Sequence, residues 1–220
     1  MARRGDLGRE EARLSGVTEL DVVTDAARPH CALVLASTSP QRRAILEQLQ
    51  IPFTAVAPAY VEHDPPDADP VTLVRDHAEG KARSVHAARA VTLGVDTTVH
   101  LDGRVYAKPV DQNDARRMLA ELAGRTHLVI SGLCLLGDGF AVVDHEVTAV
   151  RFREVSAAER ELYLEAGEWS GRAGGYAIQG LGARLVAGVD GDYLNVVGLP
   201  ATLLLDTLAT YAPNLLQSGR

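Results

Sequence analysis

Residues 35–46, LASTSPQRRAIL, place hydroxyl and basic side chains where a buried strand is predicted to end and a helix to begin. Ser39 and Pro40 are typical of the N-cap and the first position of a helix. Arg42 then falls in the first turn, where the helix dipole disfavours a cation by about 0.3–1 kcal/mol. The free N–H groups of a helix N-terminus bind anions, and a bound phosphate would offset this repulsion. The pattern therefore predicts that Arg42 and Arg43 bind phosphate together with the hydroxyl groups of residues 37–39, with two solvated surface arginines as the alternative.

Lysine is rare in this chain, because the 22 basic residues include only Lys81 and Lys108. A compact ammonium and a planar guanidinium are not interchangeable at a phosphate or carboxylate site. The two lysines are thus candidates for positions that need an ammonium. Coding bias together with chance is the alternative.

Asp96 lies within TLGVDTTV, a strand-like run in which its neighbours are apolar or β-branched. A carboxylate is rarely buried without a partner or a metal ion. Asp102 and Gly103 predict a hairpin turn that brings Lys108 back towards Asp96. The pattern fits a structural ion pair, or a carboxylate that holds a cation or activates water.

The segment 58–70, PAYVEHDPPDADP, is predicted to be an acidic loop. Glu62 could supply a second metal carboxylate, since Mg²⁺ at phosphate sites is held by one or two carboxylates with waters and phosphate oxygens. For His63 and Asp64 a solvated turn is the favoured interpretation. The seven histidines lack the spacing of a zinc site.

The glycine-rich run 173–180, AGGYAIQG, allows a close approach of the backbone to a ligand. The amide of Gln179 could read the edge of a nucleotide base. An exposed glutamine in a glycine-dense turn is the alternative.

Apolar periodicity and turn signals predict strands and helices that alternate, with several hairpins among them. The expected strands cover 32–37, 53–57, 127–136 and 140–155, and helices are expected near 40–50, 71–88, 111–124 and 156–166. Short strands and tight loops are expected between 171 and 198, before a final helix. This order predicts an α/β fold with a mixed sheet and flanking helices.

Composition limits the class of protein. A net charge of −7 and a pI near 5.5 argue against a partner that is a nucleic acid polymer. The sequence shows neither a long apolar run nor a signal peptide, so we expect a cytoplasmic protein with no membrane partner. Residues 1–30 are predicted to be a poorly ordered leader, 31–212 a single domain and 213–220 a C-terminal tail. Cys31 and Cys134 are expected to be free thiols.

The order of these motifs resembles that of the Maf family of nucleoside triphosphate pyrophosphatases. The resemblance runs from Leu33 to Leu208, and the segments that carry it are LASTSPQRRAIL, GVDTTVHLDGRVYAKP, AGRTH, AGGYAIQGLGA and DGDYLNVVGLP. It implies a fold with a central cleft, related to that of inosine triphosphate pyrophosphatases. It also implies hydrolysis of a nucleoside triphosphate to the monophosphate and pyrophosphate, with a divalent cation such as Mg²⁺ or Mn²⁺. The resemblance also suggests a homodimer.

The resemblance also implies roles for individual residues. Asp96 takes the position of the proton acceptor, and Glu62 with Asp96 would hold the metal ion. The residues that would bind the phosphates are Ser37, Arg42, Lys81 and Lys108.

The base of the substrate depends on three further positions. Thr97 and Gln179 resemble the branch of the family that acts on dTTP and UTP. Gln41 departs from that branch, which usually has arginine there. The alternatives are therefore 7-methyl-GTP or another modified nucleotide as substrate, or a nucleotide-binding regulator of septum formation.

Overall fold

The computed structural model describes residues 33–65 and 68–217, so the leader expected at 1–30 lies outside the described residues. The strands are β1 (Leu33–Ala36), β2 (Phe53–Val56), β3 (Val91–Leu101), β4 (Arg104–Tyr106), β5 (Thr126–Gly137), β6 (Phe140–Phe152) and β7 (Val186–Asp190). The helices are α1 (Pro40–Gln48), α2 (Pro70–Val85), α3 (Gln112–Leu122), α4 (Ala157–Glu165), α5 (Tyr193–Val197) and α6 (Ala201–Tyr211). Three 3₁₀ turns complete the order: η1 (Ala173–Gly175), η2 (Leu181–Leu185) and η3 (Pro213–Leu216).

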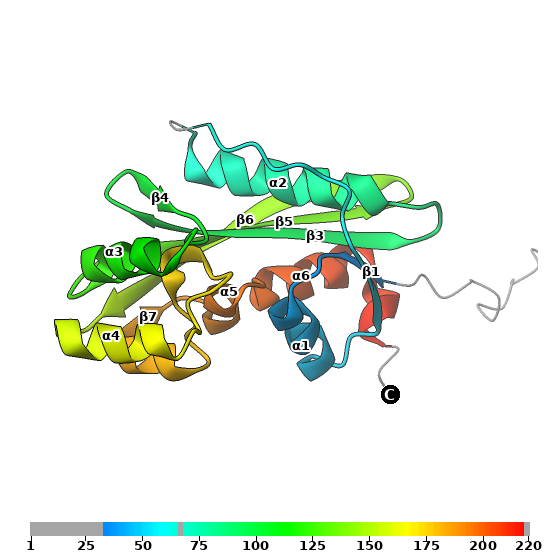
Figure 1. Cartoon of the computed structure of the whole chain (residues 1–220). Helices are drawn as coiled ribbons and strands as arrows, with labels where there is room; N and C mark the ends of the chain where they lie inside the picture. Colours follow the sequence, from blue (N-terminus) through cyan, green and yellow to red (C-terminus); the bar gives the residue numbers. More distant parts are fainter. Residues whose placement is uncertain (1–32, 66–67, 218–220) are drawn as a thin grey trace, which may run out of the picture.

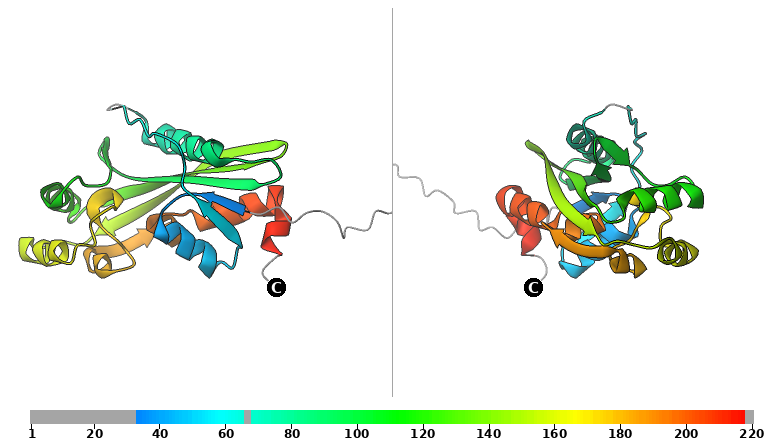
Figure 2. Two further views of the ribbon diagram at one scale, coloured as in Figure 1. Left: turned by 45° about the vertical axis from the view of Figure 1, so that its right-hand side comes forward. Right: turned by 90° about the vertical axis from the view of Figure 1, so that its left-hand side faces the viewer.

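The strands form one seven-stranded mixed sheet in the order β2-β1-β3-β5-β6-β7, with β4 paired to β3. Strand β1 runs parallel to β2 and β3, whereas β3, β5, β6 and β7 form an antiparallel succession. Helix α2 covers one face of the sheet, and α1, α5 and α6 lie on the opposite side (Figures 1 and 2). The predicted mixed α/β fold with flanking helices is confirmed.

One edge of β3 is left open between two neighbours. Strand β1 pairs with β3 only as far as Gly94, and β4 begins to pair with β3 at Val99. Residues 95–98 therefore have no strand partner on this edge within the described part of the chain. The opening lies at the carboxyl end of β1, which is where α/β sheets commonly bind ligands.

Helix α2 packs unusually close to the sheet because two glycines lie beneath it. A Cβ atom on Gly94 would lie 2.0 Å from the carbonyl oxygen of Ala78, and one on Gly132 would lie 2.1 Å from that of Val74. Gly94 precedes Asp96 by two residues on β3, and Gly132 is paired with Asp96 on β5. All three thus share one face of the sheet, and α2 can reach Asp96. The buried face of α2 consists of Leu73, Val74, His77, Ala78, Lys81 and Ala82.

Several local signals of the sequence are borne out. Ser39 caps α1 with Pro40 at its start, and Asp111 caps α3. The turn at Asp102 and Gly103 joins β3 to β4. Ser156 and Glu159 form a capping box at α4, in which each side chain accepts a hydrogen bond from the other's backbone N–H.

The glycine-rich segment 171–198 agrees with the expected short strands and tight loops except for one short helix. It contains β7, but also the turns η1 and η2 and the short helix α5. Gly174 and Gly175 adopt positive φ angles, +69° and +71°, which tighten η1 into a turn. Strand β6 ends at Phe152, three residues before its predicted end at 155.

Two large apolar clusters lie on the face of the sheet opposite α2, and a smaller third one lies beneath α2. One cluster joins β1, β3 and β5 to α1 and α6, and a second joins the far ends of β3 and β5 to α3, α4 and Tyr176. Cys134 is a buried free thiol as predicted, and Cys31 lies outside the described residues. None of the helices in the described ranges has the length and apolar character needed to cross a bilayer.

The close approach of α2 predicts the effect of Gly94→Ala. The new Cβ would meet backbone atoms of α2, so the helix must shift, and we expect the free energy of unfolding to fall by about 1–3 kcal/mol. Urea denaturation followed by circular dichroism measures this. The matched control is Gly188→Ala on β7, whose Cβ would meet only the end of the Arg151 side chain at 3.1 Å. Equal losses in both variants would contradict the close-packing argument.

Candidate active site

A cavity of about 610 Å³ lies at the open edge of β3. Its walls come from the β1–α1 connection, β3, the loop before α2, the segment after β4 and the glycine-rich segment after α4. The predicted site residues that line it are Ser37, Gln41, Arg42, Glu62, Lys81, Thr97, Lys108 and Gln179. Asp96 does not line it directly, but it is paired with Lys81, which does and which also contacts Glu62. The structure thus brings all nine residues to one place.

Arg42 is fixed by three acceptors at the start of α1. Its Nε donates to the carbonyl oxygen of Gly198 at 2.9 Å, Nη1 donates to Ser37 Oγ at 3.4 Å, and Nη2 donates to Thr97 Oγ1 at 3.3 Å. A guanidinium carries five N–H donors, so two remain for a ligand. Burial lowers the pKa of Arg42, while the nearby charges of Asp96 and Glu62 act in the opposite direction.

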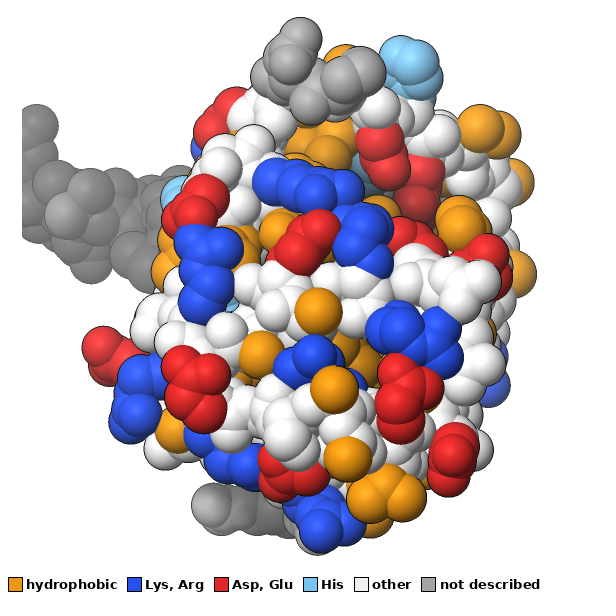
Figure 3. Space-filling model, turned by 60° about the vertical axis from the view of Figure 1, so that its left-hand side comes forward, with side chains coloured by type: hydrophobic (Ala, Val, Ile, Leu, Met, Phe, Trp, Pro, Cys, Tyr) orange, Lys and Arg blue, Asp and Glu red, His pale blue; other side chains and the backbone are white. Residues whose placement is uncertain are grey.

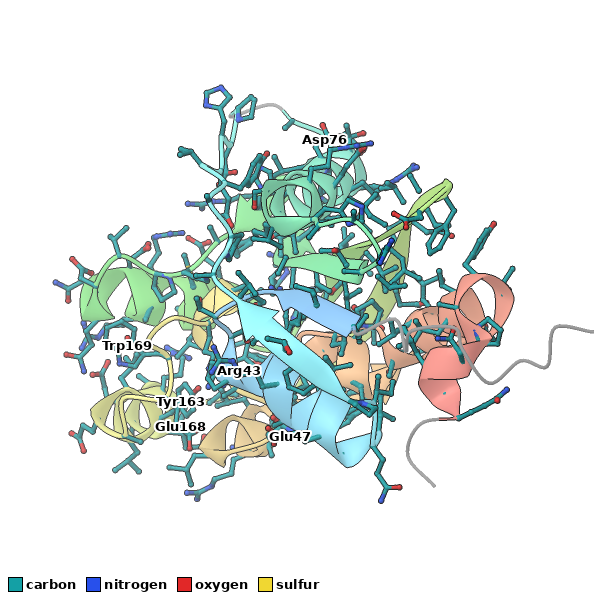
Figure 4. The ribbon with its side chains drawn as sticks, turned by 90° about the vertical axis from the view of Figure 1, so that its right-hand side faces the viewer. Arg43, Glu47, Asp76, Tyr163, Glu168 and Trp169 are labelled. Atoms are coloured by element: carbon teal, nitrogen blue, oxygen red, sulfur yellow. The ribbon has the colours of Figure 1, made fainter. Side chains whose placement is uncertain are left out.

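The remaining polar groups at this helix start are partly paired with each other. Ser39 N donates to Ser37 Oγ at 3.1 Å, and Ser39 Oγ donates to Gln41 Oε1 at 3.0 Å. The amide N–H₂ of Gln41 therefore stays available towards the cavity. Arg43 is exposed on α1, as is Glu47 one turn later (Figure 4). The two arginines of the opening motif thus have different surroundings.

Lys81 joins the two carboxylates that the sequence assigned to a metal ion. Its Nζ lies 2.5 Å from Asp96 Oδ1 and 2.6 Å from Glu62 Oε1. The lysine side chain is 9% exposed, and that of Asp96 is 15% exposed. A charge taken out of water needs such partners, because an unpaired buried ion is strongly destabilising. In this structure the Lys81 ammonium occupies the position between the carboxylates, instead of facing the cavity alone.

His77 is a residue of this cluster that sequence reasoning missed. Its Nδ1 lies 3.5 Å from Asp96 Oδ2, and its Nε2 lies 3.3 Å from the carbonyl oxygen of His63 and 3.4 Å from Asp64 Oδ1. The spacing between histidines in the sequence does not reveal it. The available signal was the helical period, since His77 precedes Lys81 by four residues and so shares its buried face. Figure 4 shows Asp76, the residue before it, on the outer side of α2.

The loop that carries Glu62 is seated on the same face of α2. The ring of Tyr60 lies against Gly80, where a Cβ would be only 2.2 Å from a ring carbon. The Tyr60 ring also meets the His77 ring edge-on, with centroids 5.7 Å apart. His77, Gly80 and Lys81 together therefore hold this loop, and Asp64, expected in a solvated turn, reaches His77 from it although its side chain is 57% exposed.

The donor set of this cluster suits a divalent cation. Glu62, His77 and Asp96 each offer one ligand atom, and these atoms lie within 4.8 Å of one another. Burial acts to raise the pKa of Asp96, but the hydrogen bond with His77 and the charges of Lys81 and Arg42 outweigh it and hold the pKa well below its ordinary value. The pKa of His77 is raised, chiefly by its hydrogen bond to Asp96. Two carboxylates beside an imidazole fit Mg²⁺ or Mn²⁺ chemistry.

The cavity wall formed by the segments after β4 and α4 carries further polar and charged residues. Lys108 and Gln179 line it with exposed side chains, and within the described ranges neither has a hydrogen-bond or ion-pair partner. Glu168 lines it too, in the segment that follows α4 (Figure 4). Strand β4 ends at Tyr106, so Lys108 is placed by the chain beyond the predicted hairpin and not by pairing with β3.

The comparisons with known proteins decide the family. Residues 32–211 match the family model described as Maf-like protein. The chain belongs to the Maf family. All nine site residues fall inside the matched range, so the Maf resemblance inferred from the motifs is confirmed.

Two curated relatives show how much of this Maf protein is shared. A protein of Symbiobacterium thermophilum named "dTTP/UTP pyrophosphatase" is 41% identical over 189 residues, which cover 85% of this chain and 97% of the relative. One of Moorella thermoacetica with the same name is 45% identical over 188 residues and covers 81% and 94%. A solved HAM1 protein from Coxiella burnetii covers 83% of this chain and 100% of its own at a TM-score of 0.45 and 14% identity. The fold is assigned from the strand order and register of the sheet, not from this likeness.

A buried histidine supports the wall of the cavity. His127 Nε2 lies 2.8 Å from the hydroxyl of Tyr176, which lines the cavity, and the two rings meet edge-on. His127 is 1% exposed, and its Nδ1 has no hydrogen-bond partner among the described residues. Burial lowers the pKa of His127 from 6.5 to about 4. The histidine is therefore neutral in the folded protein at pH 7.

This shift predicts how stability depends on pH. Between pH 6.5 and about 4 the unfolded chain binds a proton at His127 that the folded chain does not, so stability falls as the pH falls. The contribution reaches about 3 kcal/mol at most. Urea unfolding of the wild type and of His127→Gln at several pH values measures it. The variant should lose less stability across this window, and parallel curves would contradict the assignment.

Proposed function

We propose that this protein hydrolyses dTTP, UTP or a modified pyrimidine nucleoside triphosphate to the monophosphate and pyrophosphate. The observation that carries the proposal is the meeting of Arg42, Lys81 and Lys108 with the Glu62–Asp96 carboxylate pair around one cavity. Phosphoryl chemistry needs positioned positive charge and an aligned water more than a covalent nucleophile. The names of the curated relatives support the same activity.

Each carboxylate has a role in the proposed reaction. Glu62 and Asp96 would hold a divalent ion, which supplies positive charge to the phosphate oxygens and lowers the pKa of a bound water. Asp96, kept ionised by its neighbours, orients the water and accepts its proton. The water oxygen forms a bond to the α-phosphorus, and the bond from that phosphorus to the bridging oxygen breaks. Pyrophosphate then leaves with the electron pair of that bond.

The cations bind the charge that develops on the leaving group. Arg42 has two free N–H donors towards the cavity, and Ser37 holds its guanidinium in place. Lys108 has no other partner in the described part of the chain and is free to reach a phosphate. Lys81 would exchange one carboxylate for a phosphate oxygen when an ion enters between Glu62 and Asp96. The three residues act through charge, which is worth most in a site that excludes water.

The proposed preference for a pyrimidine rests on amide and hydroxyl groups. Uracil and thymine present two carbonyl acceptors and one N–H donor, and the amide of Gln179 offers both a donor and an acceptor. Thr97 is engaged with Arg42 and with Ser131 Oγ at 2.9 Å, so it would act on specificity by orienting Arg42. Gln41 contributes a neutral N–H₂ group where the dTTP/UTP branch has a cation.

Two expectations of the sequence remain predictions. They are the homodimer that the resemblance implies and the location in the cytoplasm. The view in Figure 3 shows basic and acidic side chains interspersed over one face of the molecule, without a continuous basic surface. This distribution, with the net charge of −7, agrees with a small nucleotide as partner better than with a nucleic acid polymer.

The proposal predicts the outcome of a hydrolysis panel. We expect pyrophosphate release from dTTP and UTP in the presence of Mg²⁺ or Mn²⁺, and Asp96→Asn should lower kcat by about 10²–10⁴-fold because the proton acceptor is lost. The panel includes canonical triphosphates and 7-methyl-GTP, and circular dichroism checks that the variant is folded. Absence of turnover with every triphosphate, together with retained nucleotide binding, would favour the regulator of septum formation.

Gln41 gives a separate test of base specificity. Gln41→Arg should raise kcat/KM for dTTP or UTP relative to 7-methyl-GTP on the order of tenfold, the effect of one charge-assisted hydrogen bond. The matched control is Gln48→Arg, because Gln48 is exposed at the other end of α1. A wild-type preference for 7-methyl-GTP would overturn the pyrimidine assignment, and an unchanged ratio in Gln41→Arg would remove Gln41 from specificity.

A further inference from the structure

The two ring nitrogens of His77 have different partners. Nε2 lies 3.3 Å from the carbonyl oxygen of His63, and Asp64 Oδ1 is 3.4 Å away. Both partners are acceptors, so Nε2 must carry a hydrogen and donate it. Nδ1 lies 3.5 Å from Asp96 Oδ2, and the residue as a whole is 3% exposed. The ring is therefore held in one orientation, with Nδ1 turned towards Asp96.

This orientation leaves a position for a cation. When Nδ1 gives up its proton, its lone pair points towards a carboxylate oxygen of Asp96. Two acceptors at this distance repel each other unless a proton or a metal ion lies with them. A metal-binding histidine typically donates its other N–H to a backbone carbonyl or a carboxylate, which fixes the tautomer. His77 has both kinds of partner at Nε2.

The spacing of the donors also fits one shared ion. Octahedral coordination with bonds of about 2.1 Å places neighbouring ligand atoms about 3 Å apart and opposite ones about 4.2 Å apart. The Nδ1–Oδ2 separation of 3.5 Å falls within this span. The ligand atoms of Glu62, His77 and Asp96 lie within 4.8 Å of one another, so small side-chain movements bring all three onto one ion. Lys81 bonds Oδ1 of Asp96, so Oδ2 stays available on the His77 side.

We propose that His77 is a third protein ligand of the ion that Glu62 and Asp96 hold, and that its nitrogen makes the site select Mn²⁺-like transition-metal ions over Mg²⁺. Mg²⁺ is bound through oxygen and gives up its waters reluctantly, whereas first-row transition metals accept imidazole readily. The inference rests on the proposed function only in taking these carboxylates as the metal site. It adds a residue and a metal preference to that site.

The test measures metal binding without nucleotide, so it does not depend on turnover. The probe is Mn²⁺, followed by electron spin-echo envelope modulation, which detects a nitrogen bonded to the ion. We expect nitrogen modulation in the wild type and its loss in His77→Gln. Calorimetric titration should show the Mn²⁺ affinity of His77→Gln reduced about 10–100-fold, with Mg²⁺ affinity changed by no more than about threefold.

The matched control is His63→Gln, which removes a neighbouring imidazole but keeps the backbone carbonyl that accepts from His77. This variant should retain both the nitrogen modulation and the Mn²⁺ affinity of the wild type. The inference is overturned if Mn²⁺-loaded wild-type protein shows no nitrogen modulation, if His77→Gln keeps it, or if Mn²⁺ does not bind at millimolar concentration. The wild-type spectrum alone decides the matter should His77→Gln fail to fold.

The outcome is separable from that of the proposed function. A nitrogen-bound Mn²⁺ site in a protein that releases pyrophosphate from no triphosphate would overturn the proposed activity and leave the His77 ligand standing. Active hydrolysis with an all-oxygen Mn²⁺ site would do the reverse. His77 would then be a positioning partner of Asp96 that carries a proton.

Discussion

The site depends on a buried ammonium held between two carboxylates. Lys81 reaches Asp96 on the sheet and the more exposed Glu62 on the loop, and neither the Lys81 nor the Asp96 charge could be buried at this place alone. The contact requires α2 to lie close to the sheet, which Gly94 and Gly132 permit. The packing of one helix thus sets the positions of Lys81, of both carboxylates and of the loop. A bulkier residue beneath α2 would move all of them together.

At the open edge of β3, successive polar side chains point to opposite faces of the sheet. Asp96 points towards α2 and its cations, and Thr97, the next residue, points towards Arg42 on the other side. Strand geometry imposes this alternation. Because β1 ends at Ala36 and β4 begins to pair only at Val99, groups from both faces reach one cavity across the gap. A nucleotide there would meet donors from α1 and α2 at once.

Much of this arrangement could be predicted from the sequence because its signals are local. The Ser39–Pro40 start of α1, the turn at Asp102 and the capping box at Ser156 each depend on a few adjacent residues. His77 could not be found by the spacing of histidines, since its partners are a backbone carbonyl and residues on another strand and loop. The short helix α5 could not be predicted because it follows a glycine-rich run, in which positive φ angles allow several kinds of tight turn.

The sequence by itself determined the alternation of strands and helices, the motifs of the Maf family and the residue types that phosphate and metal chemistry need. These follow from periodicity and from the properties of individual side chains. Only the tertiary structure decided that the Lys81 ammonium lies between Glu62 and Asp96. The same holds for the approach of His77 to Asp96 and for the hydrogen bond that Arg42 donates to Thr97. Such contacts join residues far apart in the chain, and their geometry depends on how closely α2 and α1 pack against the sheet.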